Sequence, residues 1–312
     1  MRRRAVIDVG TNSIKLLVAD VAGRHVLPVH EESRQTRLGR GFYDTHRLQP
    51  EAVACTAEAV WEFAQNARER NADSIRVIAT SAARDAVNPD DLTATIERVS
   101  GLKVEIISGE REAEWAFQGV TTDAELAKQP LLLLDVGGGS AQFILGQGEH
   151  KHFARSFPMG TVRLMEKFPH SDPPTRGEFN ACRDWIRDFL RNEVRARLDP
   201  ALQREARSSS SEIQLVGTGG TSSILARIEA KLDRYDRERL EAVRLSLERI
   251  KRHRRRLWRL PLAERKEIVG LPKLRADVIL TGVLIYEMVM VEFGFNQLRA
   301  STRGLRFAAV MD

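Results

Sequence analysis

The sequence predicts an α/β protein made of two related domains. The first observation is an internal repeat, in which an aspartate, a glycine and a serine recur in the same frame 127 residues later. These residues are Asp8, Gly10 and Ser13, followed by Asp135, Gly137 and Ser140. The second is the alternation of strand-like and helix-like apolar spacing. The third is a length of 312 residues with 42% hydrophobic side chains, which suits two cores. We place the domains at residues 1–124 and 125–312.

The first domain is expected to begin with an antiparallel meander and to continue with alternating helices and strands. Alternating apolar residues between glycine turns predict the meander, and apolar residues at helical spacing predict the helices. The strands are expected at residues 5–9, 14–20, 25–30, 75–80 and 103–108, and the helices after Pro50, over 91–99 and after Gly109.

The second domain repeats this plan and then becomes mainly helical. Thr175 and Glu178 have the spacing of a capping box at the start of a long helix. The four serines at 208–211 predict a loop. The strands are expected at 131–136, 141–145, 150–157, 213–216 and near 297–301.

Three glycine-rich turns follow strands in this scheme. Such turns direct several backbone N–H groups to one point and therefore favour anions. The turns are Gly10 to Ser13, Gly137 to Ser140 and Gly217 to Thr221, with hydroxyls from Thr11, Ser13, Ser140, Thr218 and Thr221. Asp8 and Asp135 would repel phosphate, so they are better suited to a bridging cation such as Mg²⁺. The sequence thus predicts phosphate binding with Mg²⁺.

Other motifs and the charge narrow the function class. The chain contains neither G-x-x-x-x-G-K-[ST] nor G-x-G-x-x-G, which argues against a P-loop protein and a dinucleotide-binding oxidoreductase. A formal net charge of +6 suits a polyanionic partner without choosing among nucleic acid, anionic lipid and phosphate polymer. The basic run at 251–259 is either a solvated helix face or a track that draws a polyanion, and Trp258 within it is either a core residue or a base-stacking one.

The expected location is the cytoplasm. Cys55 and Cys182 lack the spacing of a metal site or a disulfide framework. Asp8 interrupts the apolar segment that a signal peptide would need. The longest apolar region carries Glu287 and is too short to span a bilayer. We therefore expect no membrane association. We also expect no specific nucleic-acid partner.

Taken together, these residues resemble the exopolyphosphatase and guanosine pentaphosphate phosphatase family. IDVGTNSIKLLV, LLLDVGGGSAQF and GTGGT are similar to its glycine turns, and ATSAARDAVN and ISGEREAEWAF to two further segments. The similarity runs in order from about residue 5 to residue 307 and fits the short, two-domain members. It implies two duplicated domains of the actin, Hsp70 and sugar kinase type, which is ribonuclease H-like, with an interdomain cleft. It also implies a homodimer.

The resemblance implies hydrolysis of a terminal phosphoanhydride in polyphosphate or in a phosphorylated guanine nucleotide, guanosine pentaphosphate, with Mg²⁺ held by Asp8 and Asp135. Glu112 would activate water and Arg84 would neutralise developing charge. The expected phosphate-binding residues are Gly10, Thr11, Asn12, Ser13, Lys15, Gly137, Gly138, Gly139, Ser140, Gln142, Gly217, Thr218, Gly219, Gly220 and Thr221.

Several alternatives stay open at the level of the sequence. Gln142 stands where the family usually has glutamate. The glutamine keeps an oxygen acceptor but lacks the negative charge, so we expect a lower affinity for the cation. A protein that binds polyphosphate or an alarmone without catalysis is therefore one alternative. A kinase that uses ATP at the same turns is a second alternative.

Single residues also have competing interpretations. Glu112 is either catalytic or a solvated glutamate beside its acidic neighbours Glu110 and Glu114. Arg84 is alternatively the partner of Asp85 or Asp90 in a surface ion pair. Arg275 and Asp277, which we expect to begin the long apolar helix, either support the cleft or cap that helix.

Overall fold

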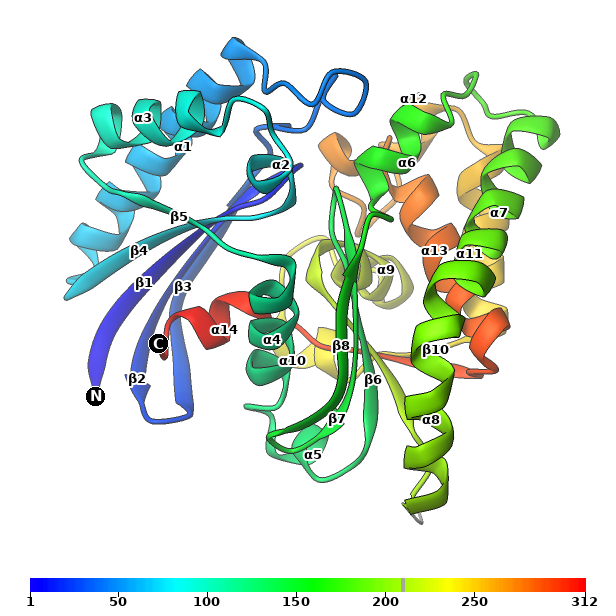
Figure 1. Ribbon diagram of the computed structural model, residues 1–312. Coiled ribbons are helices and arrows are strands. Elements are labelled where there is room, and N and C mark those ends of the chain that lie inside the picture. Colours follow the sequence, from blue (N-terminus) through cyan, green and yellow to red (C-terminus); the bar gives the residue numbers. More distant parts are fainter. Residues whose placement is uncertain (209–210) are drawn as a thin grey trace. The chain divides into compact units, whose positions relative to one another are not determined.

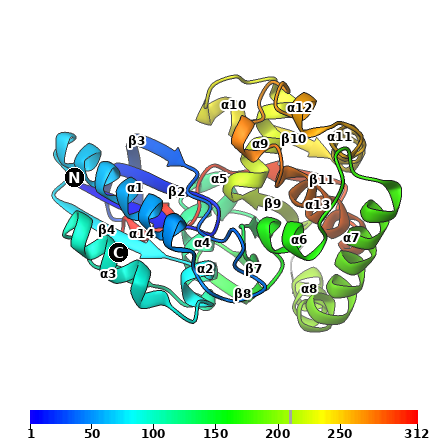
Figure 2. The same ribbon diagram turned by 90° about the horizontal axis from the view of Figure 1, so that it is seen from above.

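The computed structural model describes residues 1–208 and 211–312, and their contacts divide the chain into two compact units. The first comprises Met1–Thr122, Gly137–Gly139 and Arg303–Asp312, and the second comprises Asp123–Val136 and Ser140–Thr302. Each unit contains one β-sheet with helices packed on it (Figure 1, Figure 2). The predicted α/β class is confirmed.

The sheet of the first unit has five strands in the order β3-β2-β1-β4-β5. The first three form the predicted antiparallel meander, and β4 and β5 run parallel to β1. Their bounds are β1 (Arg2–Val9), β2 (Ile14–Ala22), β3 (His25–Arg34), β4 (Ser74–Ala79) and β5 (Val104–Ile106). Because β1, β4 and β5 are parallel, their carboxyl ends lie at one edge, where open α/β sheets bind ligands.

Helices cover both faces of this sheet. They are α1 (Pro50–Glu69), α2 (Ser81–Arg84), α3 (Pro89–Ser100), α4 (Gly109–Val120) and α14 (Leu305–Ala309). Alternate residues of a strand point to opposite faces. Ile7 and Val9 of β1 therefore join the core with α1 and α3, whereas Val6 joins the core with α4 and α14. Asp8 shares the face of Val6 and so lies on the side of α4.

The sheet of the second unit has six strands in the order β10-β11-β9-β6-β7-β8. Strands β6, β7 and β8 repeat the antiparallel meander, and β9 and β11 continue the sheet in parallel. The bounds are β6 (Leu131–Val136), β7 (Ala141–Gln147), β8 (His150–Phe157), β9 (Gln214–Thr218), β10 (Arg244–Ser246) and β11 (Gln297–Ala300). The prediction that the second half repeats the first is confirmed. The short strand β10, however, lies where the sequence predicted helix.

The helices of the second unit build its large core. They are α5 (Ala124–Ala127), α6 (Thr161–Lys167), α7 (Arg176–Phe189), the π-helix η1 (Leu190–Arg195), α8 (Ala196–Ser208), α9 (Gly219–Ala230), α10 (Arg237–Glu241), α11 (Leu247–Arg259), α12 (Leu262–Arg265), the 3₁₀ helix η2 (Lys273–Arg275) and α13 (Ile279–Phe293). Leu132 and Leu134 of β6 share a core with α7, α11 and α13. Asp135 points to the opposite face by the alternation of the strand.

The capping box at the start of α7 is present as predicted. The Thr175 hydroxyl accepts a hydrogen bond from Glu178 N, and the Glu178 carboxylate accepts one from Thr175 N. Hydrogen bonds from the backbone of Thr175 and Ser171 lower the pKa of Glu178 to about 2. Of the loop predicted at 208–211, residues 209 and 210 lie outside the described residues.

The predicted domain boundary differs from the division into units at the carboxyl-terminal end. We placed residues 125–312 in one domain, whereas Arg303–Asp312 belongs to the first unit. Arg4 Nη1 donates to Met311 O at 2.9 Å, and Arg306 Nη1 donates to Leu16 O at 2.7 Å. The apolar side of α14 also completes the core on the α4 face of the first sheet. Such long-range packing leaves no local signal in the sequence.

Candidate active site

The first glycine turn is tightly closed by its own backbone and by the loop that follows β3. Gly10 N donates to Ser13 O at 3.1 Å, and Gly39 N donates to Thr11 O at 2.7 Å. The side chains of Thr11, Asn12 and Ser13 are buried, and the Asn12 amide nitrogen has no hydrogen-bond partner among the described residues. The turn therefore holds polar donors in a fixed place at the carboxyl end of β1.

Asp8 is a buried acid beside this turn. It is 8% exposed, and its Oδ1 has no hydrogen-bond partner in the described part of the chain. Burial raises the pKa of Asp8, and the positive charges of Lys15 and Arg306 act against this rise. Lys15 is the residue opposite Asp8 in the β1–β2 register. A buried carboxylate oxygen without a partner suits a cation ligand.

The two residues predicted to be catalytic are in direct contact. Arg84 ends α2, and Glu112 lies in the first turn of α4, so both follow the carboxyl ends of parallel strands. Arg84 Nη1 donates to Glu112 Oε2 at 3.0 Å and to Ile107 O at 3.1 Å. The contact to Asp85 is longer, 3.7 Å from Arg84 Nε. Glu112 is thus the main carboxylate partner of Arg84.

Burial separates Glu112 from its acidic neighbours. Glu112 is only 9% exposed, whereas Glu110 lies on the exposed side of α4 and Glu114 is half-buried. The interpretation of Glu112 as a solvated surface glutamate is therefore wrong. A buried carboxylate held by a charge-assisted hydrogen bond keeps a defined orientation, as a general base requires.

In the second unit, Gln142 organises the hydroxyls next to the second glycine turn. Gln142 is 1% exposed and lies opposite Asp135 in the β6–β7 register. Its Nε2 donates to Ser140 Oγ at 2.8 Å and to Ser156 Oγ at 3.0 Å. A glutamate at this position could not donate these hydrogen bonds while charged. Gln142 therefore fixes the orientation of the Ser140 hydroxyl.

The third glycine segment is a helix start rather than a free turn, which corrects the sequence interpretation. Gly217 and Thr218 end β9, and Gly219 to Thr221 form the first turn of α9. Gly219 has φ 82°, and a Cβ on it would overlap Asp135 Oδ1. Asp135 therefore lies against the amino-terminal end of α9, where unpaired N–H groups favour negative charge.

Two residues near this helix start were not predicted as binding residues. The Arg275 guanidinium lies close to Gly220. A Cβ added to Gly220 would be 2.9 Å from Arg275 Nη2. The Tyr286 hydroxyl lies 3.1 Å from Leu134 O and 3.3 Å from Thr218 O and shares its proton between them, which ties β6 to β9. Burial, and then the charge of Asp135, raises the pKa of Tyr286. A tyrosine within the long apolar region was the available signal, because a buried hydroxyl needs partners.

The start of the apolar helix also differs from the sequence prediction. Arg275 ends η2, and Asp277 precedes α13, which begins at Ile279. Asp277 Oδ1 accepts a hydrogen bond from Val278 N at 2.9 Å. Both residues therefore lie in the connection before the helix.

The predicted site residues fall into two groups, one in each unit. Asp8, the Gly10–Ser13 turn, Lys15, Arg84 and Glu112 belong to the first unit together with Gly137–Gly139, and the remaining residues belong to the second. The cleft between the domains stays a prediction.

The donor set is compatible with Mg²⁺. Over residues 1–208 and 211–312, no three His, Cys, Asp or Glu side chains form a metal-binding group. Mg²⁺ commonly uses only one or two carboxylates and takes its other ligands from phosphate and water. The buried, unpartnered Oδ1 of Asp8 fits that requirement.

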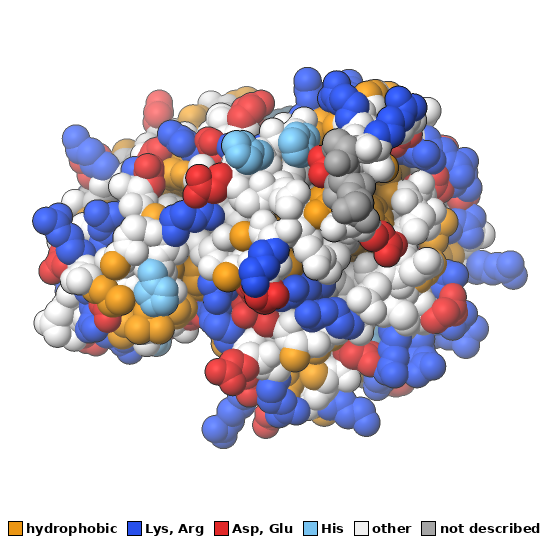
Figure 3. Space-filling model, turned by 90° about the horizontal axis from the view of Figure 1, so that it is seen from below, with side chains coloured by type: hydrophobic (Ala, Val, Ile, Leu, Met, Phe, Trp, Pro, Cys, Tyr) orange, Lys and Arg blue, Asp and Glu red, His pale blue; other side chains and the backbone are white. Residues whose placement is uncertain are grey.

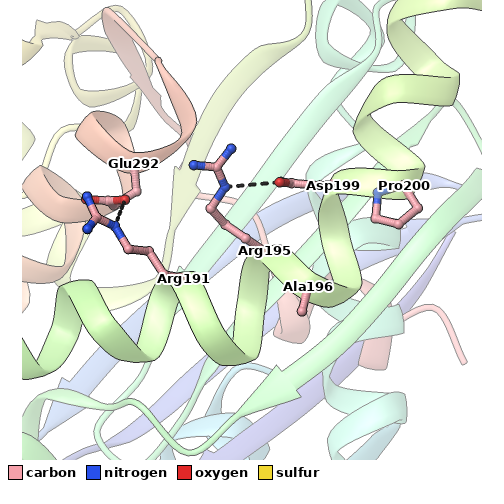
Figure 4. A pocket seen from close by; sticks show the side chains of 6 residues that line it. All are labelled: Arg191, Arg195, Ala196, Asp199, Pro200 and Glu292. Atoms are coloured by element: carbon pink, nitrogen blue, oxygen red, sulfur yellow. Dashed lines mark hydrogen bonds and ion pairs between the residues drawn. The ribbon is translucent and has the colours of Figure 1, made fainter.

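A surface pocket of about 570 Å³ is lined by none of these residues. It is formed by η1 and α8 with Glu292 of α13 (Figure 4). Its arginines are already paired, Arg191 Nε with Glu292 Oε2 at 2.7 Å and Arg195 Nε with Asp199 Oδ2 at 3.0 Å. The pocket therefore offers little free positive charge to an anion. Among the described residues, no helix is both long and apolar enough to cross a membrane.

Comparison with known proteins places this geometry in a family. The model of the Ppx/GppA phosphatase family matches residues 17–311. Exopolyphosphatase 2 of Mycobacterium tuberculosis is 35% identical over 317 residues, with 96% of this chain and 95% of that protein covered. Exopolyphosphatase 1 of Mycobacterium bovis is 27% identical, with 92% and 81% covered.

Solved structures agree with the sequence comparison. An exopolyphosphatase from Cytophaga hutchinsonii has a TM-score of 0.84 and 28% identity, with 98% of this chain and 96% of that chain covered. The PPX-GPPA enzyme of Aquifex aeolicus has a TM-score of 0.77 and 28% identity, with 99% of each chain covered. The protein is therefore a phosphatase-type hydrolase built from two actin-like α/β units. The chain belongs to the Ppx/GppA phosphatase family, and the resemblance found in the sequence is confirmed.

Proposed function

We propose that this chain is a Mg²⁺-dependent exopolyphosphatase, which removes terminal phosphates from inorganic polyphosphate. The observation that carries the proposal is the Arg84–Glu112 contact, a buried carboxylate held at 3.0 Å by an arginine at the carboxyl edge of the first sheet. Polyphosphate as the substrate is supported by the exopolyphosphatases of Mycobacterium tuberculosis and Cytophaga hutchinsonii, to which the chain is similar over most of its length.

Glu112 acts as the general base in this proposal. Its carboxylate takes a proton from water while the water oxygen bonds to the terminal phosphorus. The bond between that phosphorus and the bridging oxygen then breaks, and the shortened chain leaves with the bonding electrons. Arg84 holds Glu112 Oε2, while its Nη2 forms no hydrogen bond with the described residues and is available to phosphate oxygens.

The remaining residues bind the substrate. The backbone N–H groups at the start of α9 and the donors of the Gly10–Ser13 turn suit phosphate oxygens, and Lys15 adds a positive charge. Gln142 fixes Ser140 as a further donor. Asp8 and Asp135 would hold Mg²⁺, which when bound neutralises the charge of the phosphates. The proposal requires that both units act on one substrate chain.

Three further features belong to the proposal. Guanosine pentaphosphate ends in the same type of anhydride, so we propose it as a second substrate. A homodimer is proposed on the strength of the family membership. A location in the cytoplasm is supported by the two free cysteines, Cys55 and Cys182, because a reducing compartment keeps thiols unpaired.

The test is phosphate release from polyphosphate, with and without Mg²⁺, by the wild type, Glu112→Gln and Glu110→Gln. We expect Glu112→Gln to lower kcat by about 10² to 10⁴, because the proton acceptor is lost. Glu110→Gln removes the same charge from an exposed position of the same helix and is expected to behave like the wild type. Equal activity of both variants would rule out Glu112 as the base.

Gln142 favours a second candidate, a protein that binds polyphosphate without hydrolysing it. The second hairpin carries a neutral amide opposite Asp135, and that amide is committed to two serine hydroxyls. Tight binding of polyphosphate by the wild type without phosphate release in Mg²⁺ would establish the binder and refute the hydrolase.

A further inference from the structure

The net charge of the chain resides in one helix. Helix α11 contains seven Lys or Arg residues and one Glu, a formal charge of +6. The whole chain has 49 Lys and Arg against 43 Asp and Glu, so the residues outside α11 carry 42 of each sign. Both signs are distributed over the face of the molecule drawn in Figure 3. The positive excess is therefore local.

One side of α11 anchors it firmly. Ile250, Leu257 and Trp258 are buried, and Trp258 Nε1 donates to Leu280 O at 3.0 Å. Arg254 reaches Glu287 of α13 with two hydrogen bonds, 2.7 Å from Nε and 3.1 Å from Nη2. The helix is thus a rigid support for whatever its other side presents. The suggestion that Trp258 stacks on a base is wrong, because its ring is in the core.

Three of the seven basic residues already have carboxylate partners. Besides Arg254, Arg249 pairs with Glu229 of α9. Lys251 pairs with a residue of its own helix, because its Nζ lies 2.9 Å from Glu248 Oε1. The charges of these three residues are neutralised locally, so they contribute little to the attraction of an external anion.

The other four arginines form one exposed face. They are Arg252, Arg255, Arg256 and Arg259, and none has a carboxylate within ion-pair distance among the described residues. Glu248, which is already paired, acts on Arg255 only through its charge. Their spacing of three, four and seven residues places the four on one side of the helix over about 10 Å. The helix dipole accounts for Arg256 and Arg259 in the last turn, but not for the two nearer the middle. Like charges at this spacing destabilise a helix, and a bound polyanion would reduce the repulsion between the four arginines.

We infer that this arginine face is a second binding site for polyphosphate, which holds a distal part of a long chain. The inference rests on the proposed function, because it assigns the site to the same substrate. Guanidinium groups match phosphate oxygens with paired donors, and a row of them suits a repeating anion. The paired arginines of the pocket at η1 lack this free charge.

The connection through α9 predicts a dependence on chain length. The amino-terminal end of α9 holds Gly219 to Thr221. Glu229, near the other end of α9, contacts α11, because its Oε2 lies 2.7 Å from His253 Nε2. A helix of 12 residues is about 18 Å long. The two ends of α9 therefore lie about 18 Å apart, and a substrate that occupies both the glycines and the arginine face of α11 must be a long chain. Tripolyphosphate is too short to bridge the two places, whereas a long polyphosphate can.

The chemistry of the face favours polyphosphate over other polyanions. All exposed residues of α11 are charged, so it presents no aromatic ring for stacking on nucleic-acid bases. It also presents no apolar side chain for insertion into a lipid surface. Recognition by charge alone fits a polymer that consists only of phosphates.

The experiment compares two variants with equal loss of charge. The first changes Arg252, Arg255, Arg256 and Arg259 to Gln, and the control changes the exposed Arg2, Arg98, Arg204 and Arg239 to Gln. The readout is the ratio of kcat/KM for long polyphosphate to kcat/KM for tripolyphosphate, at several salt concentrations. We expect the α11 variant to lower this ratio on the order of tenfold at low salt and to weaken its salt dependence. The control should keep the ratio of the wild type.

Direct binding completes the test. Long polyphosphate, an oligothymidylate and anionic lipid vesicles are titrated against the wild type and the α11 variant. A selective loss of polyphosphate binding supports the inference. An unchanged ratio and unchanged polyphosphate binding in the α11 variant would overturn it, as would a loss confined to the oligonucleotide or the vesicles. If the wild type hydrolyses neither substrate, the proposed function fails, and the binding titrations alone still decide whether this face binds polyphosphate.

Discussion

The β1–β2 and β6–β7 hairpins share a register but differ in what faces their aspartates. Asp8 lies opposite Lys15, and Asp135 lies opposite Gln142, in equivalent positions of the repeat. Lys15 opposes the rise in the pKa of Asp8 that burial causes. Gln142 instead donates to Ser140 and leaves Asp135 beside the start of α9. Duplication has thus kept the backbone positions while the two acids acquired different electrostatic surroundings.

The largest expected effect comes from neutralising each aspartate in turn. If Asp8 and Asp135 both serve Mg²⁺, Asp8→Asn and Asp135→Asn each lower kcat on the order of a hundredfold and raise the Mg²⁺ concentration for half-maximal activity. Phosphate release over a Mg²⁺ titration measures both quantities. An effect confined to one variant would show that only one of the two aspartates serves the cation.

The glycines beside the two aspartates should differ in tolerance. Gly219→Ala combines a φ of 82° with an overlap against Asp135, so we expect a loss of about 3 kcal/mol in the free energy of unfolding. In Gly10→Ala the new Cβ would lie 3.0 Å from Ser13 O, and we expect a loss of about 1 kcal/mol. Urea denaturation compares the two, and equal losses would contradict the close approach of Asp135 to α9.

Asp8 should make stability depend on pH. Because burial raises its pKa in the folded state, the folded protein binds more protons than the unfolded one between the usual value of 3.8 and the raised value. The free energy of unfolding should therefore fall as pH rises through this window. Asp8→Asn removes that dependence and is expected to gain about 1 kcal/mol at neutral pH without Mg²⁺. Urea denaturation at several pH values tests this, and a lower stability of the variant at neutral pH would refute it.

The smallest expected effect comes from restoring an acid to the second hairpin. Gln142→Glu adds a negative charge opposite Asp135, so the Mg²⁺ concentration for half-maximal activity should fall by about threefold. The variant also loses the donors to Ser140 and Ser156, and we expect about 1 kcal/mol lower stability. Gln147→Glu, at the exposed end of the same strand, is the control. An unchanged Mg²⁺ dependence would mean that this position does not influence the cation.

Local signals predicted most elements of the fold. Pro50 begins α1, Gly101 ends α3 with φ 72°, and the capping box begins α7 as expected. These features act within one turn of a helix, so the sequence displays them directly. Arg84 and Glu112 were predicted as catalytic residues only through the family resemblance, and the contact between them, 28 positions apart in the sequence, was not predicted.

What the sequence did not predict depends on tertiary contacts. The docking of α14 in the first unit and the role of Tyr286 between β6 and β9 both involve partners distant in the chain. The pattern of the basic run showed its charge but not which arginines were already paired. Only the packing of α11 separated the four exposed arginines from the three basic residues with carboxylate partners.

The return of residues 303–312 to the first unit has a consequence for biosynthesis. Leu305 and Phe307 cover the face of the first sheet that also holds Val6 and Leu17. Chains emerge from the ribosome with the amino-terminal part first. Residues 303–312 are therefore synthesised after the whole second unit, and this face of the first sheet acquires its cover of Leu305 and Phe307 only once the second unit has been translated.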